Sequence, residues 1–195
     1  ALPICHCDKV ACFSCAPLKD DPWLIGYFLD NELEWFGKNY RPWGLFDEAW
    51  KKPATHGAKQ AWIAFLKEKL PSPDEFAQLW GVAVHSWEAL AEHTEPTEPG
   101  GERAEAVARE WVRRIADAYF RTTAEAIRRH DPNHLVLGSR FAGTAPDVWD
   151  VCGTYCDVVS FNMYPRIDVE TGVPVSVIEQ IMAWQEASGK PMMIT

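Results

Sequence analysis

Four short apolar segments, each ending in polar residues, constrain the fold of this chain more than any other feature. They are residues 22–29, 134–141, 157–165 and 192–195. Strands of a parallel sheet are covered on both faces, so they are typically continuous apolar runs of this length. The segment 22–29 is therefore expected to be a buried strand covered on both faces. Helical patterns separate the four segments, which together predict right-handed βα units in a parallel sheet.

Helical periodicity is clearest between residues 102 and 130, where apolar side chains form one stripe. Mostly off this stripe lie Arg109, Arg113, Arg114, Arg121, Arg128 and Arg129. These arginines are interpreted as a solvated face. Thr55 is expected to cap a helix over 55–70. Ser72 restarts a helix with Pro73 in its first turn. Shorter helices are expected over the residues 86–92, 145–155 and 175–188.

Two parallel architectures are compatible with this order of elements. An open doubly wound sheet is expected to carry a Gly-rich phosphate turn after an early strand, and the sequence has none. A (β/α)8 TIM barrel instead collects its active site from several strand ends, as the polar termini here suggest. A whole barrel needs about 250 residues. The prediction is therefore an α/β fold in which residues 1–195 form a partial TIM-barrel catalytic domain.

The connection between the first two predicted strands is unusually long. About a hundred residues separate them, whereas a helix and its return take roughly 30. Residues 36–100 are therefore expected to be a helical insertion within the barrel domain. Five of the ten tryptophans lie there. Such loops above a barrel commonly set substrate specificity, so sugar-stacking aromatics are expected among them.

Composition excludes some partners. A net charge of −9 and a pI near 5.1 argue against nucleic-acid binding, which needs clustered cations. No apolar run reaches the roughly 20 residues that span a bilayer, and no signal peptide opens the chain. We expect a soluble protein without a membrane or cofactor partner. Its compartment, whether secreted, periplasmic or cytoplasmic, stays open.

Four cysteines crowd the beginning of the chain, at Cys5, Cys7, Cys12 and Cys15. Their types and short spacings superficially resemble a zinc site. The two pairs are only four residues apart, which leaves little chain for wrapping tetrahedral ligands around a metal. Reduced buried thiols or a locally atypical sequence are the favoured interpretations, and no metal is expected. A small metal-binding module is the alternative.

The dipeptide Asn31-Glu32 ends the first apolar segment and carries the most specific chemistry. A retaining glycosidase needs one carboxylic acid that protonates the leaving oxygen and a second carboxylate about 5 Å away as nucleophile. An amide beside the acid can hydrogen-bond the sugar 2-hydroxyl as positive charge develops on the ring.

The surroundings of these residues resemble a known family. Residues 24–35 closely resemble the fourth barrel strand of clan A glycoside hydrolases, especially family 42 beta-galactosidases and family 50 beta-agarases. Residues 131–141 and 157–164 resemble the fifth and sixth strands. Residues 190–195 resemble the seventh, after which the family places its nucleophilic Glu. The resemblance implies a fragment covering about strands four to seven.

Residue by residue, the resemblance makes Glu32 the general acid/base and Tyr164 the aromatic residue that hydrogen-bonds the nucleophile. It implies substrate contacts for Asn31, Trp35, Arg140 and Asn162, while Trp43 is a further candidate from the insertion. Glu34 lacks a preceding Asn.

The resemblance implies a retaining hydrolase that cleaves O-glycosidic bonds in a beta-linked galactoside or agar-like saccharide. An oligosaccharide or polysaccharide is the expected partner. Because the nucleophile would follow Thr195, the 195 residues alone are expected to lack glycosidase activity. The alternative is a non-catalytic carbohydrate-binding protein on the same scaffold.

Overall fold

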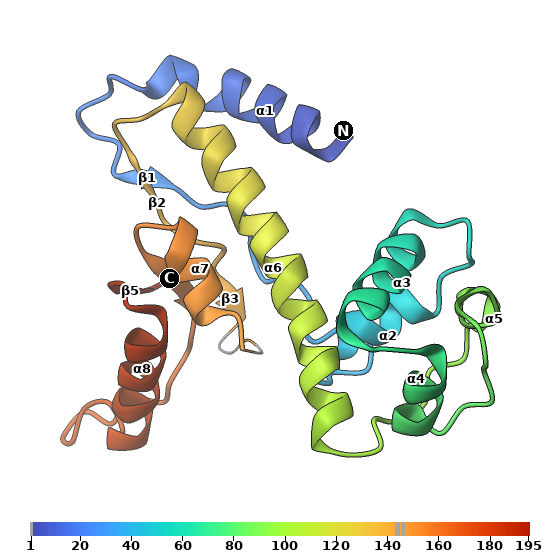
Figure 1. Ribbon diagram of the computed structural model, residues 1–195. Coiled ribbons are helices and arrows are strands. Elements are labelled where there is room, and N and C mark those ends of the chain that lie inside the picture. The colour runs from blue at the N-terminus through green and yellow to red at the C-terminus, as the bar shows by residue number, and fades with distance from the viewer. Residues whose placement is uncertain (1, 143–144, 146) are drawn as a thin grey trace. The chain divides into compact units, whose positions relative to one another are not determined.

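The computed structural model describes residues 2–142, 145 and 147–195. It is a mixed α/β structure, mostly helical, with short parallel strands (Figure 1). The chain divides into two compact units. Unit 1 comprises residues 1–33 and 115–195, and unit 2 comprises residues 34–114. The long helix α6 (Glu102–His130) contributes to both.

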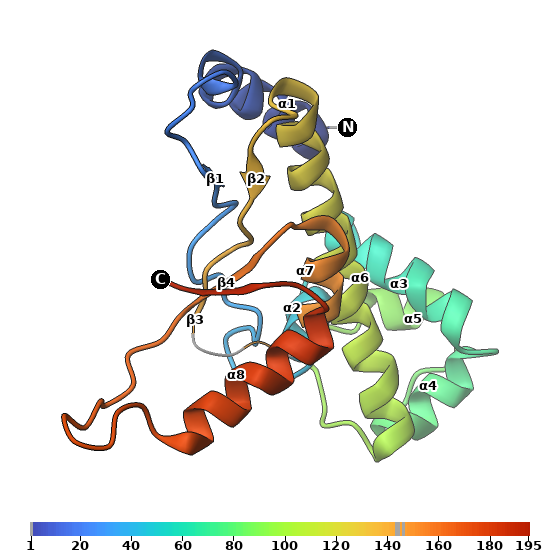
Figure 2. The same ribbon diagram turned by 90° about the vertical axis from the view of Figure 1, so that its left-hand side faces the viewer.

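Unit 1 contains all the strands of the described residues. Its elements, besides the second half of α6, are α1 (Leu2–Ser14), η1 (Ala16–Leu18), β1 (Gly26–Tyr27), β2 (Leu135–Val136), β3 (Phe141–Ala142), α7 (Trp149–Tyr155), β4 (Val159–Asn162), α8 (Val175–Ser188) and β5 (Met192–Ile194). β1 pairs in parallel with β2, and β3, β4 and β5 form a second parallel ladder in that order. Figure 2 shows β1 and β2 side by side.

Backbone hydrogen bonds outside the named strands extend the first ladder. The Leu29 amide donates to the Gly138 carbonyl (2.8 Å), and the Glu32 amide donates to the Arg140 carbonyl (3.1 Å). The first segment therefore runs alongside the second as far as Glu32. Aromatic packing covers the second ladder, where Trp149 stacks on Trp184 with ring centroids 4.7 Å apart.

The first segment is not the buried strand that its sequence predicts. Only Gly26 and Tyr27 form a strand, while Trp23 and Ile25 are 91% and 67% exposed. Among the strands of the described residues, β1 has a neighbour on one side only, β2. The prediction of cover on both faces is wrong because apolar character alone does not supply the elements that cover a strand.

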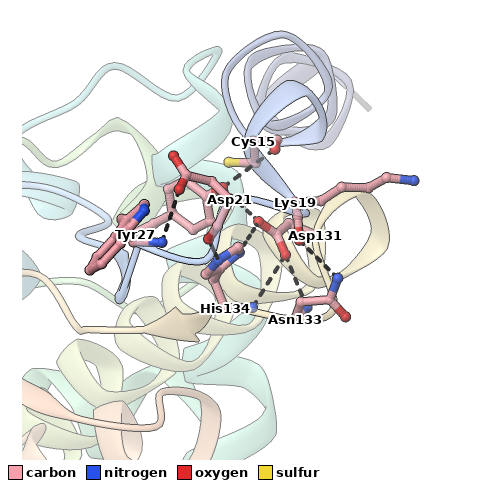
Figure 3. A network of polar contacts seen from close by, with 8 residues as sticks. Cys15, Lys19, Asp21, Tyr27, Asp131, Asn133 and His134 are labelled. Carbon is pink, nitrogen blue, oxygen red and sulfur yellow. Dashed lines mark hydrogen bonds and ion pairs between the residues drawn. The ribbon is translucent and has the colours of Figure 1, made fainter.

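A buried carboxylate anchors the chain at the other end of these strands, before β2 (Figure 3). Asp131 is fully buried and accepts hydrogen bonds from the Tyr27 hydroxyl (2.6 Å) and the Asn133 backbone amide (2.9 Å). His134 contacts it through Nδ1 at 2.7 Å, and His134 Nε2 lies 2.9 Å from the Asp21 carbonyl oxygen. The turn that ends α6 is thereby tied to the segment leading into β1.

Unit 2 is helical and has its own aromatic core. Its helices, besides the first half of α6, are α2 (Gly44–Trp50), α3 (Gly57–Lys69), α4 (Pro73–Trp80) and α5 (Trp87–Glu92). Phe76 is fully buried and stacks on Trp80, with ring centroids 4.4 Å apart. The side chain of Lys59 is also fully buried, and its Nζ donates to the carbonyls of Trp50 and His93, each at 2.6 Å.

Most predicted helices are confirmed, with local corrections. α6 and α8 match their predicted ranges. α4 begins with Pro73 in its first turn as predicted, and Ser72 and Ser86 cap α4 and α5 through their Oγ atoms. The cap of α3 is His56, which accepts from the Ala58 amide, and not Thr55. The predicted helix over 145–155 includes residue 146, which lies outside the described residues, and α7 begins at Trp149.

Two helices were not predicted from the sequence. α1 forms where the sequence shows no clean period, and tertiary contacts support it, since Asp8 pairs with Arg129 (3.0 Å) and His130 (3.1 Å) of α6. α2 follows the Gly-rich and aromatic loop after residue 36. No helix among the described residues combines the length and apolar character needed to cross a membrane.

Candidate active site

Polar residues at the ends of the four strand segments come together in unit 1. Asn31 and Glu32 follow β1, Arg140 immediately precedes β3, and Asn162 is the last residue of β4. Thr195 follows β5 directly. Parallel strands present their carboxyl ends at one edge, so side chains from segments distant in sequence can meet there.

A continuous set of hydrogen bonds joins these side chains. Asn162 Nδ2 donates to Glu32 Oε1 at 2.7 Å and to Asn31 Oδ1 at 3.2 Å. The Thr195 hydroxyl donates to Asn162 Oδ1 at 2.6 Å. Arg140 Nε in turn donates to Thr195 Oγ1 at 3.2 Å. Glu32 is therefore linked through two intermediate side chains to a guanidinium group.

The backbone at this edge is strained at two of the same residues. Glu32 has a φ of 53° and Arg140 a φ of 45°, both in the left-handed region that non-glycine residues rarely adopt. Such strain costs about 1–3 kcal/mol per residue and persists where surrounding contacts enforce it. Here the Glu32 amide donates to the Arg140 carbonyl (3.1 Å), and the Arg140 amide donates to the buried Ser160 Oγ (3.0 Å).

Exposure differs across the group in a way that suits a binding site. Asn31 and Glu32 are exposed, whereas Asn162 retains only 5% of its surface. The Arg140 guanidinium lies over the Phe28 ring, 5.5 Å from its centroid. The arrangement therefore presents the accessible carboxyl group of Glu32 and the accessible amide of Asn31, both hydrogen-bonded to the buried amide of Asn162.

The sequence comparison relates this arrangement to known enzymes. No family model matches the sequence. Over 151 residues, 75% of the chain, the sequence is 30% identical to Beta-agarase B of Vibrio sp. (strain JT0107). Over 186 residues, 90% of the chain, it is 30% identical to Beta-agarase A of the same strain. The chain is homologous to part of these beta-agarases.

Solved structures agree with this homology. The chain superposes on an exo-beta-agarase with a TM-score of 0.82 and 26% identity, covering 98% of this chain and 26% of that one. A beta-galactosidase from Halorubrum lacusprofundi matches with a TM-score of 0.57 and 21% identity, over 96% of this chain and 28% of that one, and shows the fold alone. The chain spans 16% and 18% of the length of its two Vibrio beta-agarase relatives.

The remaining predicted site residues occupy different surroundings. Tyr164 lies two residues beyond β4 in unit 1 and is 84% exposed. Trp35 and Trp43 belong to unit 2 and are buried, at 5% and 9% exposure. The guanidinium groups of Arg41 and Arg109 lie 5.8 and 5.9 Å from the Trp43 ring centroid. These contacts engage Trp43 in packing rather than leaving its ring open.

Sequence reasoning missed two residues of the site. Thr195 and Ser160 each hold a predicted site residue by a hydroxyl group. The signal that finds Thr195 is the same one that finds Glu32, a polar residue immediately after an apolar strand. Ser160 lies within β4 and gives no such signal, since its importance depends on the neighbouring strand.

The four N-terminal cysteines lie in two kinds of surroundings, the exposed surface and a cavity. Cys5 and Cys12 are exposed on α1, while Cys7 and the buried Cys15 line a cavity of about 450 Å³ with residues of β1 and α6. Burial raises the pKa of the Cys15 thiol. Within the described residues, no three or more His, Cys, Asp or Glu side chains gather as metal ligands would.

Proposed function

We propose that the protein containing this chain is a retaining glycoside hydrolase acting on an agar-like, beta-linked galactose polysaccharide, with Glu32 as its general acid/base. The observation that carries the proposal is the exposed Glu32 carboxyl group, held by Asn162 at the carboxyl edge of the parallel strands. The homology to beta-agarases supports the polysaccharide substrate.

The proposed chemistry assigns a task to each side chain. Glu32 protonates the departing glycosidic oxygen and later, as a carboxylate, activates the incoming water. Asn31 and Arg140 donate hydrogen bonds to sugar hydroxyls beside the reacting carbon. Tyr164 is proposed to hydrogen-bond the nucleophilic carboxylate, which by the family resemblance follows Thr195. Covalent catalysis needs both carboxyl groups, so the 195 residues alone are proposed to be inactive.

A portion of a (β/α)8 barrel is the proposed scaffold. Each strand segment neighbours the next in parallel, in the order of the sequence, as successive barrel strands do. Residues 36–100 are proposed as the helical insertion, and unit 2 covers a similar range.

The proposal predicts a specific kinetic defect when Glu32 is replaced. In the full-length protein, Glu32→Gln should lower turnover of a substrate with a poor leaving group by about 10²–10⁴-fold. An aryl galactoside with an acidic phenol needs little protonation, so its glycosylation step should be affected far less. Azide should restore turnover of that substrate, because it replaces water without base assistance.

Glu34→Gln is the matched control, because Glu34 is also exposed and lies two residues away. It pairs with Lys38 on its own turn and should retain activity. A full-length protein that binds agar oligosaccharides but never cleaves them would contradict the proposal and favour a carbohydrate-binding protein.

A further inference from the structure

The hydrogen bonds from Arg140 to Glu32 form one directed chain, in which each group donates to the next. Arg140 Nε always carries a proton and can only donate, so Thr195 Oγ1 must accept from it. The single proton of the Thr195 hydroxyl then points to the nearer remaining acceptor, Asn162 Oδ1 at 2.6 Å, rather than the Phe161 carbonyl at 3.3 Å. With the Thr195 proton on Oδ1, the Asn162 amide turns Nδ2 toward Glu32 Oε1 and Asn31 Oδ1, which accept from it.

The orientation of Asn162 determines what Glu32 and Asn31 present to a ligand. With Oδ1 facing Thr195, the two protons of Asn162 Nδ2 face Glu32 Oε1 and Asn31 Oδ1. A flipped amide would instead bring its oxygen against these two oxygens. Because Asn162 is almost fully buried, water cannot readily replace the lost hydrogen bonds.

We propose that Thr195 is a positioning residue, which relays the fixed donor character of Arg140 to Asn162 and so determines which oxygen of Glu32 carries the transferable proton. Glu32 Oε1 is held as an acceptor, and the proton is carried on Oε2. Asn31 Oδ1 is likewise occupied, so its amino group faces outward and recognises an acceptor oxygen of the sugar. The inference rests on the proposed role of Glu32 as proton donor.

A pair of Thr195 variants in the full-length protein tests the inference. Thr195→Val keeps the side-chain shape but removes the hydroxyl, and Thr195→Ser keeps the hydroxyl. Thr195→Val should lower kcat on the natural polysaccharide on the order of tenfold, a fraction of what a general acid supplies. It should leave an aryl galactoside with an acidic phenol nearly unchanged. Thr195→Ser should restore the natural rate.

Other outcomes separate the inference from the proposed function. An equal loss on both substrates, or no rescue by Thr195→Ser, would reduce Thr195 to a structural role and overturn the inference. If Glu32→Gln shows the leaving-group dependence and Thr195→Val does not, only the inference fails. If Glu32→Gln shows none, the proposed function fails.

The 195-residue chain provides a second measurement that does not depend on a folded Thr195 variant. Nuclear Overhauser effects from the Asn162 side-chain amide protons should reach Glu32 and Asn31, and these protons should exchange slowly with water. Contacts from the same protons to the Thr195 side chain would mean the reverse amide orientation and would overturn the inference.

Discussion

At the scale of single residues, Gly138 illustrates how closely the strand edge is packed. It has a φ of 81°, and a Cβ there would lie 3.0 Å from both the Ser160 nitrogen and the Val158 oxygen. Gly138→Ala should therefore lower the free energy of unfolding by about 2 kcal/mol, from left-handed strain and crowding. Gly57→Ala is the control, because nothing lies near its Cβ position. Urea denaturation gives the free energy of unfolding of each variant. If Gly138→Ala is as stable as Gly57→Ala, the predicted strain at Gly138 is contradicted.

The buried Lys59 of unit 2 predicts a rise in stability with alkaline pH. Burial lowers the pKa of Lys59 to about 8, against the partial opposition of Glu92. The unfolded lysine keeps its proton up to about pH 10.4. Between about pH 8 and about pH 10.4 the unfolded state binds more protons than the folded state. The free energy of unfolding therefore rises with pH, by a total on the order of 3 kcal/mol at most.

Lys59→Met removes that titration and should lack the rise between pH 8 and 10, although it also loses the hydrogen bonds to two carbonyls. Denaturation of both proteins across this range is the measurement. If the free energies of unfolding of the two proteins change with pH in the same way, the lowered pKa of Lys59 is contradicted.

At the scale of elements, the turn between α6 and β2 predicts the opposite pH dependence. Both ring nitrogens of His134 face acceptors, an arrangement that favours the protonated imidazole. Hydrogen bonding to the Asp21 carbonyl, and then to Asp131, raises the pKa of His134. The stabilisation that protonated His134 gives to the folded chain is complete below about pH 6.5. It is lost as the pH rises through the raised pKa of His134.

Asp131 defines the acid limit of the same turn. Burial pushes the pKa of Asp131 upward, but hydrogen bonds from Tyr27 and His134 outweigh it and hold the pKa below its ordinary value. Its contribution is lost only as pH falls through that lowered value. His134→Gln should therefore destabilise the chain more at pH 5.5 than at pH 8.5 in thermal melts. A pH-independent difference would mean an uncharged His134.

Elements whose signals are local could be predicted from the sequence. The start of α4 is one example, because Ser72 and Pro73 are residue types that are favoured at a helix N-terminus. In the structure Ser72 Oγ accepts a hydrogen bond from the Glu75 amide. α6 is long enough for its periodicity to be unambiguous. α1 and the exposure of the segment 22–29 depend instead on what packs against them. The elements that pack against a segment cannot be read from the sequence of that segment alone.

At the scale of the whole molecule, the same distinction explains the candidate site. Glu32 and Asn31 are predicted from their place after an apolar segment and from the family resemblance, and Asn162 and Arg140 from the resemblance. Parallel topology brings these residues together. Trp35 is predicted from the family resemblance and Trp43 from its residue type in the insertion, and neither signal distinguishes a packed ring from an open one. Thr195 also follows an apolar strand, but its contacts with Arg140 and Asn162 are visible only in the structure.

The two units have separate aromatic cores, so a core mutation should loosen one unit selectively. Phe76→Ala removes a fully buried ring from unit 2 and should cost about 3–5 kcal/mol. Hydrogen exchange should then accelerate in α2–α5 while amides of β4 stay protected, because local stability follows local packing. Phe161→Ala in β4 is the matched variant and should reverse the pattern. Uniform acceleration by either variant would instead indicate one cooperative unit.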